Sequence, residues 1–349
     1  MQQLPIDEFL QLAQHLPVID VRSPGEYNHA HLPGAVNIPL FDNDERAQVG
    51  TKYKNAGKDA AVLLGLSLVG PKLADFVKAS KKLNPKQKEV LVHCWRGGMR
   101  SGSFAWLLNT AGITARTLVG GYKAYRNAVL AAFAEPRTLL ILGGKTGSGK
   151  TDILHELARQ GEQIIDLEQL AHHKGSSYGA IGQQPQPSTE QFENQLYAHW
   201  RQCDPTRRIW LEDESRSVGS CFIPMPLWLQ MRAAPVAFVD VPKPVRVERL
   251  VREYTGIDHE LLVEATERIR RRLGGKVTQE ALDALTRQDY ATVADLTLDY
   301  YDKAYLHGLS QRDQATVHPL PLTGDDPVQT AQQLIAWANA TVAAPAIVR

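Results

Sequence analysis

Val90-Leu-Val-His-Cys-Trp-Arg-Gly-Gly-Met-Arg-Ser101 is the stretch around which the first part of this chain is organised. Its apolar beginning predicts a buried strand that ends at His93, and the apolar-periodic residues after Ser101 predict a helix. Cys94 then lies between the end of a strand and the start of a helix. Backbone N–H groups at a helix start have no helical partners, so they can surround an anion at this position.

The residues after Cys94 predict an anion-binding loop. Its glycines allow a tight turn, and its two arginines, together with the helix dipole, favour the thiolate over the thiol. The loop consists of Trp95, Arg96, Gly97, Gly98, Met99 and Arg100. We therefore predict that Cys94 is a nucleophile. The alternative is a buried cysteine that acts only as a small hydrophobic residue.

The composition is that of an ordinary globular protein. The chain has 349 residues, of which 43% are hydrophobic and 22% charged, and this length predicts two domains. The net charge of +1 neither favours nor excludes a nucleic-acid partner, so any such surface must be local. The three cysteines lack metal-ligand spacing and indicate a reducing compartment.

The sequence also argues against export and membrane insertion. Its N-terminus lacks the basic and apolar regions of a signal peptide. No apolar run approaches the ~20 residues that span a bilayer. We therefore expect a cytoplasmic protein with no membrane partner.

Residues 1–130 have the pattern of an α/β domain. Between the strands, residues 41–88 are predicted to be mixed helix and loop, with one helix near 71–81. Short apolar runs predict the strands, which lie in residues 17–22, 31–39, 90–92 and 115–119. Strands that alternate with helices imply a parallel sheet. Ligands of such sheets bind at the carboxyl ends of the strands, where Cys94 falls.

Four landmarks of this domain resemble the rhodanese family. They are residues 19–22, residues 31–39, the Cys94 loop and residues 120–126, in that order. The resemblance implies that Cys94 carries a chalcogen as a persulfide or a perselenide. One feature departs from the family: His93 precedes Cys94 and Arg100 lies six positions after it, which is the His-Cys-x5-Arg spacing of phosphatases of a related fold. The wider loop leaves both chalcogen transfer and phosphate-ester hydrolysis open.

A second domain, residues 138–349, follows a linker that we predict at 131–137. Residues 138–142 predict a strand, which runs into a G-x-x-x-x-G-K-T sequence and then a helical pattern. This order is the context of a P-loop, whose amides wrap a phosphate chain. The predicted diphosphate-binding residues are Gly144, Gly147, Ser148, Gly149, Lys150 and Thr151. Lys150 would neutralise the phosphates and Thr151 is a candidate Mg²⁺ ligand, whereas no tightly bound cofactor is expected.

Acidic residues add a candidate site near the P-loop. Residues 208–214 form an apolar run that ends in acids, so Glu212 or Asp213 is a candidate Walker-B-like carboxylate. Solvated acids at a strand end are the alternative. The stretches 166–179 and 211–219 also fall on the loop side of the predicted sheet, where ligands bind.

A basic cluster lies further along the chain. Residues 260–273 predict a helix that ends in four arginines. These are Arg268, Arg270, Arg271 and Arg272. They either complement the helix dipole or bind the phosphates of a nucleic acid.

The two domains together resemble the bacterial tRNA 2-selenouridine synthases over nearly the whole chain. The resemblance is carried by the Cys94 loop and by residues 144–151, 166–168, 175–176 and 211–216. It implies that wobble 2-thiouridine in tRNA is modified in two steps. Geranyl diphosphate first alkylates the sulfur, and selenium from selenophosphate then replaces the geranylthio group. In this scheme Cys94 delivers selenium, and Lys150 stabilises the departing pyrophosphate.

Two other functions stay open. The first is a P-loop kinase or NTPase with a rhodanese-type phosphatase or sensor domain. The second, a non-catalytic tRNA-binding or regulatory rhodanese, is disfavoured because both Cys94 and Lys150 are present. Each alternative has the same expected α/β architecture: an N-terminal rhodanese-like parallel-sheet domain, then a P-loop domain with a helical C-terminal part.

Overall fold

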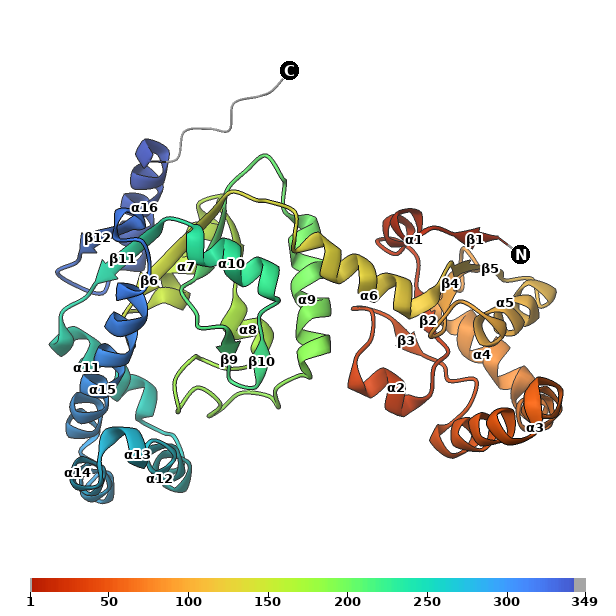
Figure 1. Cartoon of the computed structure of the whole chain (residues 1–349), viewed down its shortest axis with the longest axis horizontal. Helices are drawn as coiled ribbons and strands as arrows, with labels where there is room; N and C mark the ends of the chain where they lie inside the picture. Colours follow the sequence, from red (N-terminus) through yellow and green to blue (C-terminus); the bar gives the residue numbers. More distant parts are fainter. Residues whose placement is uncertain (1, 342–349) are drawn as a thin grey trace. The chain divides into compact units, whose positions relative to one another are not determined.

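Five parallel strands in the order β1-β5-β4-β2-β3 form the first sheet of this computed structural model (Figure 1). The structure describes residues 2–341, and the chain divides into two compact units, Met1–Ala132 and Phe133–Arg349. The strands of the first unit are β1 (Gln3–Leu4), β2 (Val18–Asp20), β3 (Val36–Asn37), β4 (Glu89–His93) and β5 (Thr114–Leu118). Its helices are α1 (Ile6–Leu12), α2 (Pro24–His29), α3 (Asn43–Val69), α4 (Leu73–Leu83), α5 (Met99–Thr110) and α6 (Gly121–Ala132), with a 3₁₀ turn at Gly70–Lys72.

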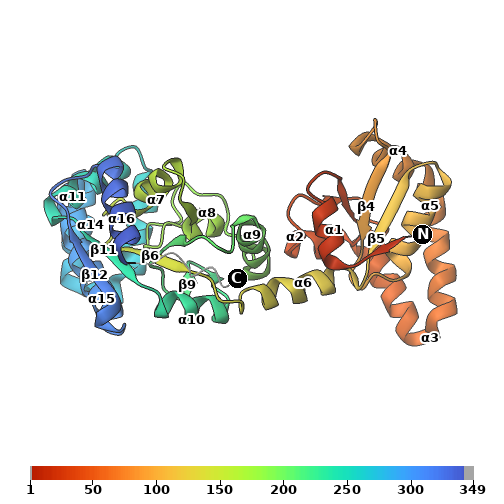
Figure 2. The same cartoon turned by 90° about the horizontal axis from the view of Figure 1, so that it is seen from above.

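Helices cover both faces of this sheet. Figure 2 shows α1 and α5 on opposite sides of β4 and β5. Val90, Leu91 and Val92 of β4 are fully buried, because a strand covered on both faces is apolar without alternation. Phe104 and Leu108 of α5 pack in the same core. The predicted parallel α/β sheet is confirmed.

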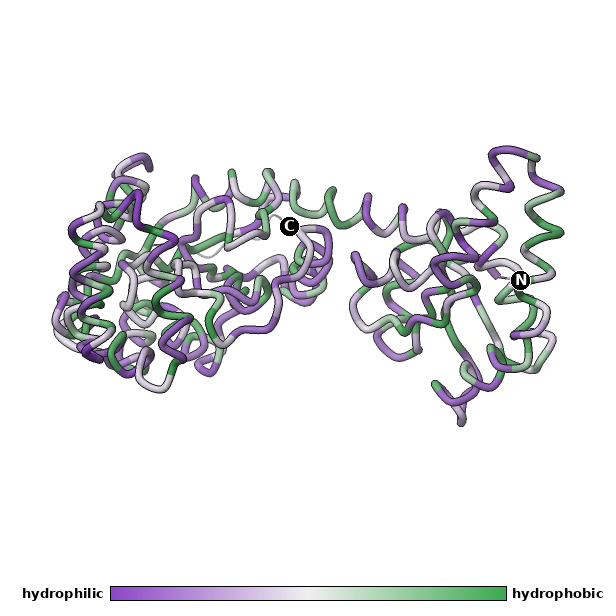
Figure 3. The backbone as a smooth tube through the Cα atoms, turned by 90° about the horizontal axis from the view of Figure 1, so that it is seen from below, coloured by the Kyte–Doolittle hydropathy of each residue, from purple (hydrophilic) through white to green (hydrophobic). Residues whose placement is uncertain are grey.

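Helix α3 is longer than the sequence pattern predicts. It begins with a capping box between Asp42 and Glu45 and bends at Gly57, whose φ of +82° is outside the helical region. Its second half carries Leu63 and Leu66, which are 67% and 63% exposed. The hydropathy of the backbone along the chain is drawn in Figure 3. Because the apolar residues of α3 do not gather on one buried face, their spacing gives no helical period.

One helical stretch, Asn43–Leu83, is long and apolar enough to cross a membrane by length and composition alone. The prediction that no run reaches this length is therefore wrong by that criterion. Polar residues such as Lys72 and Asp75 interrupt the apolar run, whereas the hydropathy averaged along the stretch stays high across them. The criterion is a weak indicator, and the stretch bends at Gly57 and contains the Gly70–Lys72 turn.

The second unit contains another parallel sheet, in the order β12-β11-β6-β8-β7. Its strands are β6 (Leu139–Gly144), β7 (Gln163–Ile165), β8 (Ile209–Glu212), β11 (Val236–Asp240) and β12 (Val317–Pro321), with a separate hairpin of β9 (Ser217–Val218) and β10 (Cys221–Phe222). Helices α7 (Lys150–Arg159) and α16 (Pro327–Thr341) pack against its core through Leu154, Leu157 and Leu334. The other helices near the sheet are α8 (Leu167–Ala171), α9 (Thr189–Gln202) and α10 (Met225–Ala233).

A helical part completes this unit. It consists of α11 (Lys243–Tyr254), α12 (His259–Arg268), α13 (Arg270–Leu273), α14 (Gly275–Thr286), α15 (Tyr290–Ser310) and a 3₁₀ turn at Gln314–Thr316. The single helix predicted over residues 260–273 is wrong, because the chain breaks between α12 and α13 at Ile269, with φ −97° and ψ 3°. Ile269 stays buried in spite of the break, so the apolar period does not reveal it.

Candidate functional site

Cys94 lies at the carboxyl end of β4, directly before the loop that leads into α5. Its side chain is 3% exposed, and its Sγ lies 3.2 Å from the hydroxyl of Ser101. The same hydroxyl is 3.3 Å from the Gly98 carbonyl oxygen, so it donates to either acceptor.

Two glycines let the Cys94 loop pack against the turn before α6. Gly97 has a φ of +66°, and a Cβ there would lie 2.6 Å from the carbonyl oxygen of Leu118. Gly121 has a φ of +60°, and its Cβ would lie 2.3 Å from the carbonyl oxygen of Cys94. Both contacts are to backbone atoms that cannot move aside. Glycine is therefore required at both positions for the loop to close.

A buried polar cluster lies behind the Cys94 loop. Arg22 donates to both carboxylate oxygens of Asp20, and its guanidinium carbon lies 3.8 Å from the ring centre of Tyr122. Burial alone would raise the pKa of Asp20, but His93 and Arg22 outweigh it and lower that pKa. Burial lowers the pKa of His93, although the neighbouring Asp20 acts in the opposite direction. Residues 19–22, which are predicted only as a family landmark, thus contribute a buried ion pair next to Cys94.

Arg100 is already engaged by a neighbouring carboxylate. Its Nη1 donates to Glu26 Oε2 at 2.9 Å, and Arg46 lies 3.8 Å from the same oxygen. Burial alone would raise the pKa of Glu26, but the hydrogen bond from Arg100 outweighs burial, and the pKa of Glu26 is lowered. Arg96, by contrast, is exposed at the surface of the loop. Of the two predicted anion-binding arginines, Arg96 is therefore the one that is exposed, and a role for either stays a prediction.

The P-loop joins β6 to α7, in the predicted order of strand, loop and helix. Gly147 and Gly149 have φ values of +77° and +73°, which glycine adopts readily. Lys150 Nζ donates to the Gly144 carbonyl oxygen at 3.1 Å and so lies back over the loop. The hydroxyl of Ser148 is buried and has no partner among residues 2–341. An unpaired buried hydroxyl inside a glycine loop is a ready donor to a phosphate oxygen.

A second cation, which sequence reasoning missed, lies against this loop. A Cβ at Gly149 would come within 2.7 Å of the Arg249 guanidinium. Arg249 of α11 forms ion pairs with Asp152 and Asp325. Desolvation alone would lower the pKa of Arg249, but the two ion pairs outweigh it and raise that pKa. No local pattern signals this residue, because it lies on an amphipathic helix 100 residues after the P-loop.

Three carboxylates gather beside the first turn of α7. Thr151 Oγ1 lies 3.2 Å from Glu168 Oε2 and 3.0 Å from Glu212 Oε1. Glu214 is hydrogen-bonded to Glu168. Burial is the largest cause that raises the pKa of each acid. Repulsion adds to it, from Asp166 on Glu168 and from Glu168 on the other two, and the pKa of Glu214 rises to about 8. Glu168 and Glu214 belong to the stretches 166–179 and 211–219. The predicted position of these stretches on the loop side of the sheet was the sequence signal for both residues.

The two Walker-B-like candidates point to different places. Glu212 contacts Thr151, whereas Asp213 accepts hydrogen bonds from Tyr305 at 2.9 Å and from Arg312. The geometry therefore favours Glu212 for this role. Within residues 2–341, no three His, Cys, Asp or Glu side chains are arranged to hold a metal ion, and Mg²⁺ at Thr151 stays a prediction.

The shared protons of this cluster predict how stability depends on pH. Between the usual carboxyl pKa and about 8, native Glu214 keeps a proton that the unfolded chain has released, so stability falls as pH rises through this window. The slope for one such group is at most about 1.4 kcal/mol per pH unit. We expect Glu214→Gln to flatten the fall in melting temperature between pH 5 and 8. Exposed Glu280→Gln serves as the control, and equal slopes in both variants would contradict the shared-proton interpretation.

The four arginines of the basic cluster are all exposed at the end of α12 and in α13. Arg270 pairs with Glu267 one turn earlier, and Arg272 donates to the Tyr300 hydroxyl at 3.4 Å. The other two members of this cluster are Arg268 and Arg271. Their exposure is compatible with binding to nucleic-acid phosphates, which stays a prediction.

Each unit matches a family model. Residues 6–128 match the rhodanese-like domain, and residues 137–321 match the tRNA 2-selenouridine synthase AAA domain. The class of this protein is therefore a fusion of a rhodanese-like domain with a P-loop-containing AAA domain.

Relatives similar over most of the chain define the family. The tRNA 2-selenouridine synthase of Bordetella petrii is 36% identical over 86% of this chain and 89% of its own length. That of Serratia proteamaculans is 37% identical over 87% of this chain and 90% of its own. The chain belongs to the tRNA 2-selenouridine synthase family of enzymes, which confirms the predicted resemblance.

One solved structure that resembles part of the chain is the full-length tRNA isopentenylpyrophosphate transferase from Bacillus halodurans. It is 12% identical, with a TM-score of 0.34, and the match covers 59% of this chain and 96% of that one. Similarity at this level supports no conclusion about the function of this chain.

Proposed function

We propose that this protein converts wobble 2-thiouridine of tRNA to 2-selenouridine through an S-geranyl intermediate, in the cytoplasm. Family membership supports tRNA as the substrate and selenium as the incoming element. The observation that carries the two-step scheme is the presence of two separate anion-binding loops. One contains a thiol, Cys94, and the other contains a lysine, Lys150, and an unpaired buried hydroxyl, Ser148.

The P-loop suits the alkylation step. The sulfur of 2-thiouridine attacks C1 of geranyl diphosphate, the C–O bond breaks, and pyrophosphate leaves with the electron pair. Lys150 and the Ser148 hydroxyl are placed to stabilise the charge that develops on the departing oxygen. Arg249 adds a further positive charge at the same loop. In this scheme the P-loop is a diphosphate clamp, and ATP hydrolysis is not required.

Alkylation prepares the selenium step. An alkylated sulfur leaves C2 as a neutral thiol, which is a better leaving group than sulfide. Cys94 is the nucleophile that acts on selenophosphate, and the selenium made available in this way adds to C2 as geranylthiol leaves. Arg96, the exposed arginine of the Cys94 loop, is available to selenophosphate and to the tRNA.

The covalent form on Cys94 follows from electron balance. Selenium in selenophosphate is already at the selenide level, so a perselenide requires an oxidant for loading and a thiol reductant for delivery. Attack on phosphorus requires neither: an S–P bond forms, the P–Se bond breaks, and hydroselenide leaves with the electron pair. Water then hydrolyses the cysteinyl phosphate. The phosphatase-type spacing from His93 to Arg100 favours this second form. Intact-protein mass spectrometry after incubation with selenophosphate separates them by the isotope pattern of selenium.

Nucleoside mass spectrometry tests the proposed function. Thiolated tRNA is incubated with the protein and geranyl diphosphate, and then with selenophosphate. We expect S-geranyl-2-thiouridine after the first addition and 2-selenouridine after the second. Sustained ATP turnover without tRNA, with no modified nucleoside, would instead support the kinase or NTPase alternative.

A further inference from the structure

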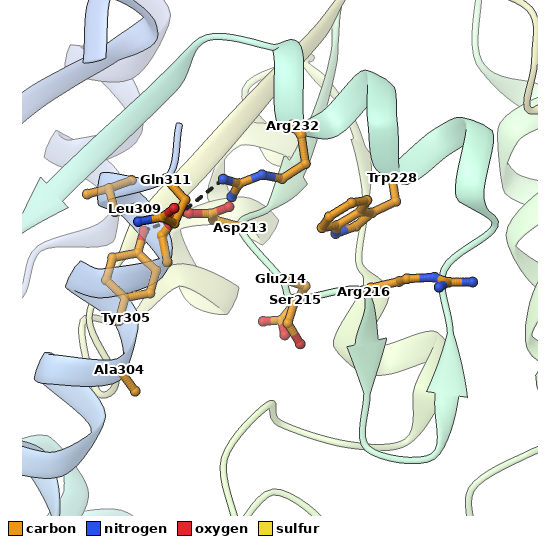
Figure 4. A pocket seen from close by; sticks show the side chains of 11 residues that line it. Asp213, Glu214, Ser215, Arg216, Trp228, Arg232, Ala304, Tyr305, Leu309 and Gln311 are labelled. Carbon is orange, nitrogen blue, oxygen red and sulfur yellow. Dashed lines mark hydrogen bonds between the residues drawn. The ribbon is translucent and has the colours of Figure 1, made fainter. Parts of the chain in front are cut away.

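A pocket of about 360 Å³ opens in the second unit between α10 and α15 (Figure 4). Trp228 of α10 lies on one side, Tyr305 and Leu309 of α15 lie on the other, and Glu214 lies between them. The volume is within the range of about 300–1,000 Å³ that is typical of small-molecule sites. No step of the proposed function yet uses this pocket.

Most polar groups around the pocket are satisfied within the protein. The carboxylate of Asp213 accepts bonds from Tyr305 and Arg312. Arg232 donates to the Gly308 carbonyl oxygen at 3.3 Å, and its guanidinium lies 5.9 Å from the centre of the Trp228 ring. What these groups leave for a ligand is mainly apolar surface, from the indole ring, from Leu309 and from Ala304 beside it. A hydrocarbon therefore fits the pocket better than a charged group.

The pocket adjoins the P-loop through one direct hydrogen bond and one chain of contacts. The Tyr305 hydroxyl accepts a hydrogen bond from the backbone N–H of Gly144, the first residue of the P-loop, at 2.9 Å. On the other side Glu214 contacts Glu168, which in turn contacts Thr151.

We propose that this pocket binds the apolar chain of the allylic diphosphate whose diphosphate group lies in the P-loop. The inference rests on the proposed function, and it assigns the geranyl chain to the space between Trp228 and Leu309. The indole ring and the leucine side chain contact the chain, and Glu214 separates it from the acids at Thr151. The depth of the pocket then sets which chain length is accepted.

Two positions on α15 allow the pocket to be filled without disturbing the fold. A Cβ at Gly308 would meet nothing within 4 Å, and leucine is a better helix former than glycine. Ala304 is exposed and lines the same space. The variants are Gly308→Leu and Ala304→Phe. The matched control is Leu306→Phe on the same helix, because Leu306 is 43% exposed and does not line the pocket.

Calorimetric titration of the full chain with geranyl diphosphate and with pyrophosphate separates the pocket from the P-loop. Pyrophosphate affinity reports the P-loop alone, and the ratio of the two affinities reports the pocket. We expect the unaltered protein and Leu306→Phe to bind geranyl diphosphate at least tenfold more tightly than they bind pyrophosphate. We expect each filled-pocket variant to lose most of this ratio, with pyrophosphate affinity unchanged within about twofold. The same variants should prefer dimethylallyl over geranyl diphosphate in alkylation of thiolated tRNA.

The outcomes distinguish the two levels of the proposal. If the unaltered protein alkylates tRNA but both filled-pocket variants keep the affinity ratio and the chain-length preference, the pocket assignment is wrong and the proposed function stands. If those variants weaken tRNA binding instead, the pocket receives a nucleobase and the assignment is also wrong. If the unaltered protein neither prefers geranyl diphosphate over pyrophosphate nor alkylates tRNA, the proposed function itself is overturned.

Discussion

Replacement of Cys94 with alanine should abolish 2-selenouridine formation and let S-geranyl-2-thiouridine accumulate. The thiol lies in the first unit, at the end of β4, and no residue of the P-loop belongs to that unit. Loss of a covalent nucleophile reduces turnover by about 10³-fold or more. The P-loop and its carboxylates are untouched, so the rate of geranylation should stay within about twofold of that of the unaltered protein.

The measurement is mass spectrometry of nucleosides from thiolated tRNA, with both co-substrates present and samples taken over time. Cys203→Ser is the matched control, because Cys203 is a free thiol of the second unit whose Sγ donates to the His199 carbonyl oxygen. It should give normal amounts of both products. Formation of 2-selenouridine at an undiminished rate by Cys94→Ala would rule out a covalent role for this thiol.

Replacement of Lys150 with alanine should produce the opposite defect. Its ammonium group lies over the P-loop, 3.1 Å from the Gly144 carbonyl oxygen, where it would neutralise a departing pyrophosphate. Removal of one such electrostatic contact typically costs about 10²–10³-fold in rate. Geranylation should fall by this factor, and 2-selenouridine should fall with it because its precursor is missing.

A bypass experiment separates this defect from misfolding. When the tRNA already carries the geranylthio group, Lys150→Ala should form 2-selenouridine at a normal rate, whereas Cys94→Ala should not. Lys243→Ala is the control for the loss of a positive charge, since Lys243 pairs with Asp295 and Asp299 on α15. Failure of Lys150→Ala on the pre-alkylated tRNA would show that the P-loop also serves the selenium step.

Much of the fold was predictable because its signals are local. A strand buried on both faces is a continuous apolar run, and β4 and β6 both have one, each followed by a glycine loop and a helix. The family resemblance depended on these same loops. Features without a local signal were missed: α3 has no amphipathic period, and the break at Ile269 keeps that side chain buried.

The sequence by itself determined the two chemical groups at the centre of this protein, the Cys94 thiol and the Lys150 ammonium, because a glycine loop between a strand and a helix is specified by neighbouring residues. Only the tertiary structure decided which distant side chains join them. It engages Arg100 with Glu26, turns Glu212 rather than Asp213 toward Thr151, and places Arg249 at the P-loop. Such contacts depend on how strands and helices pack, and residue spacing along a single segment carries no information about them.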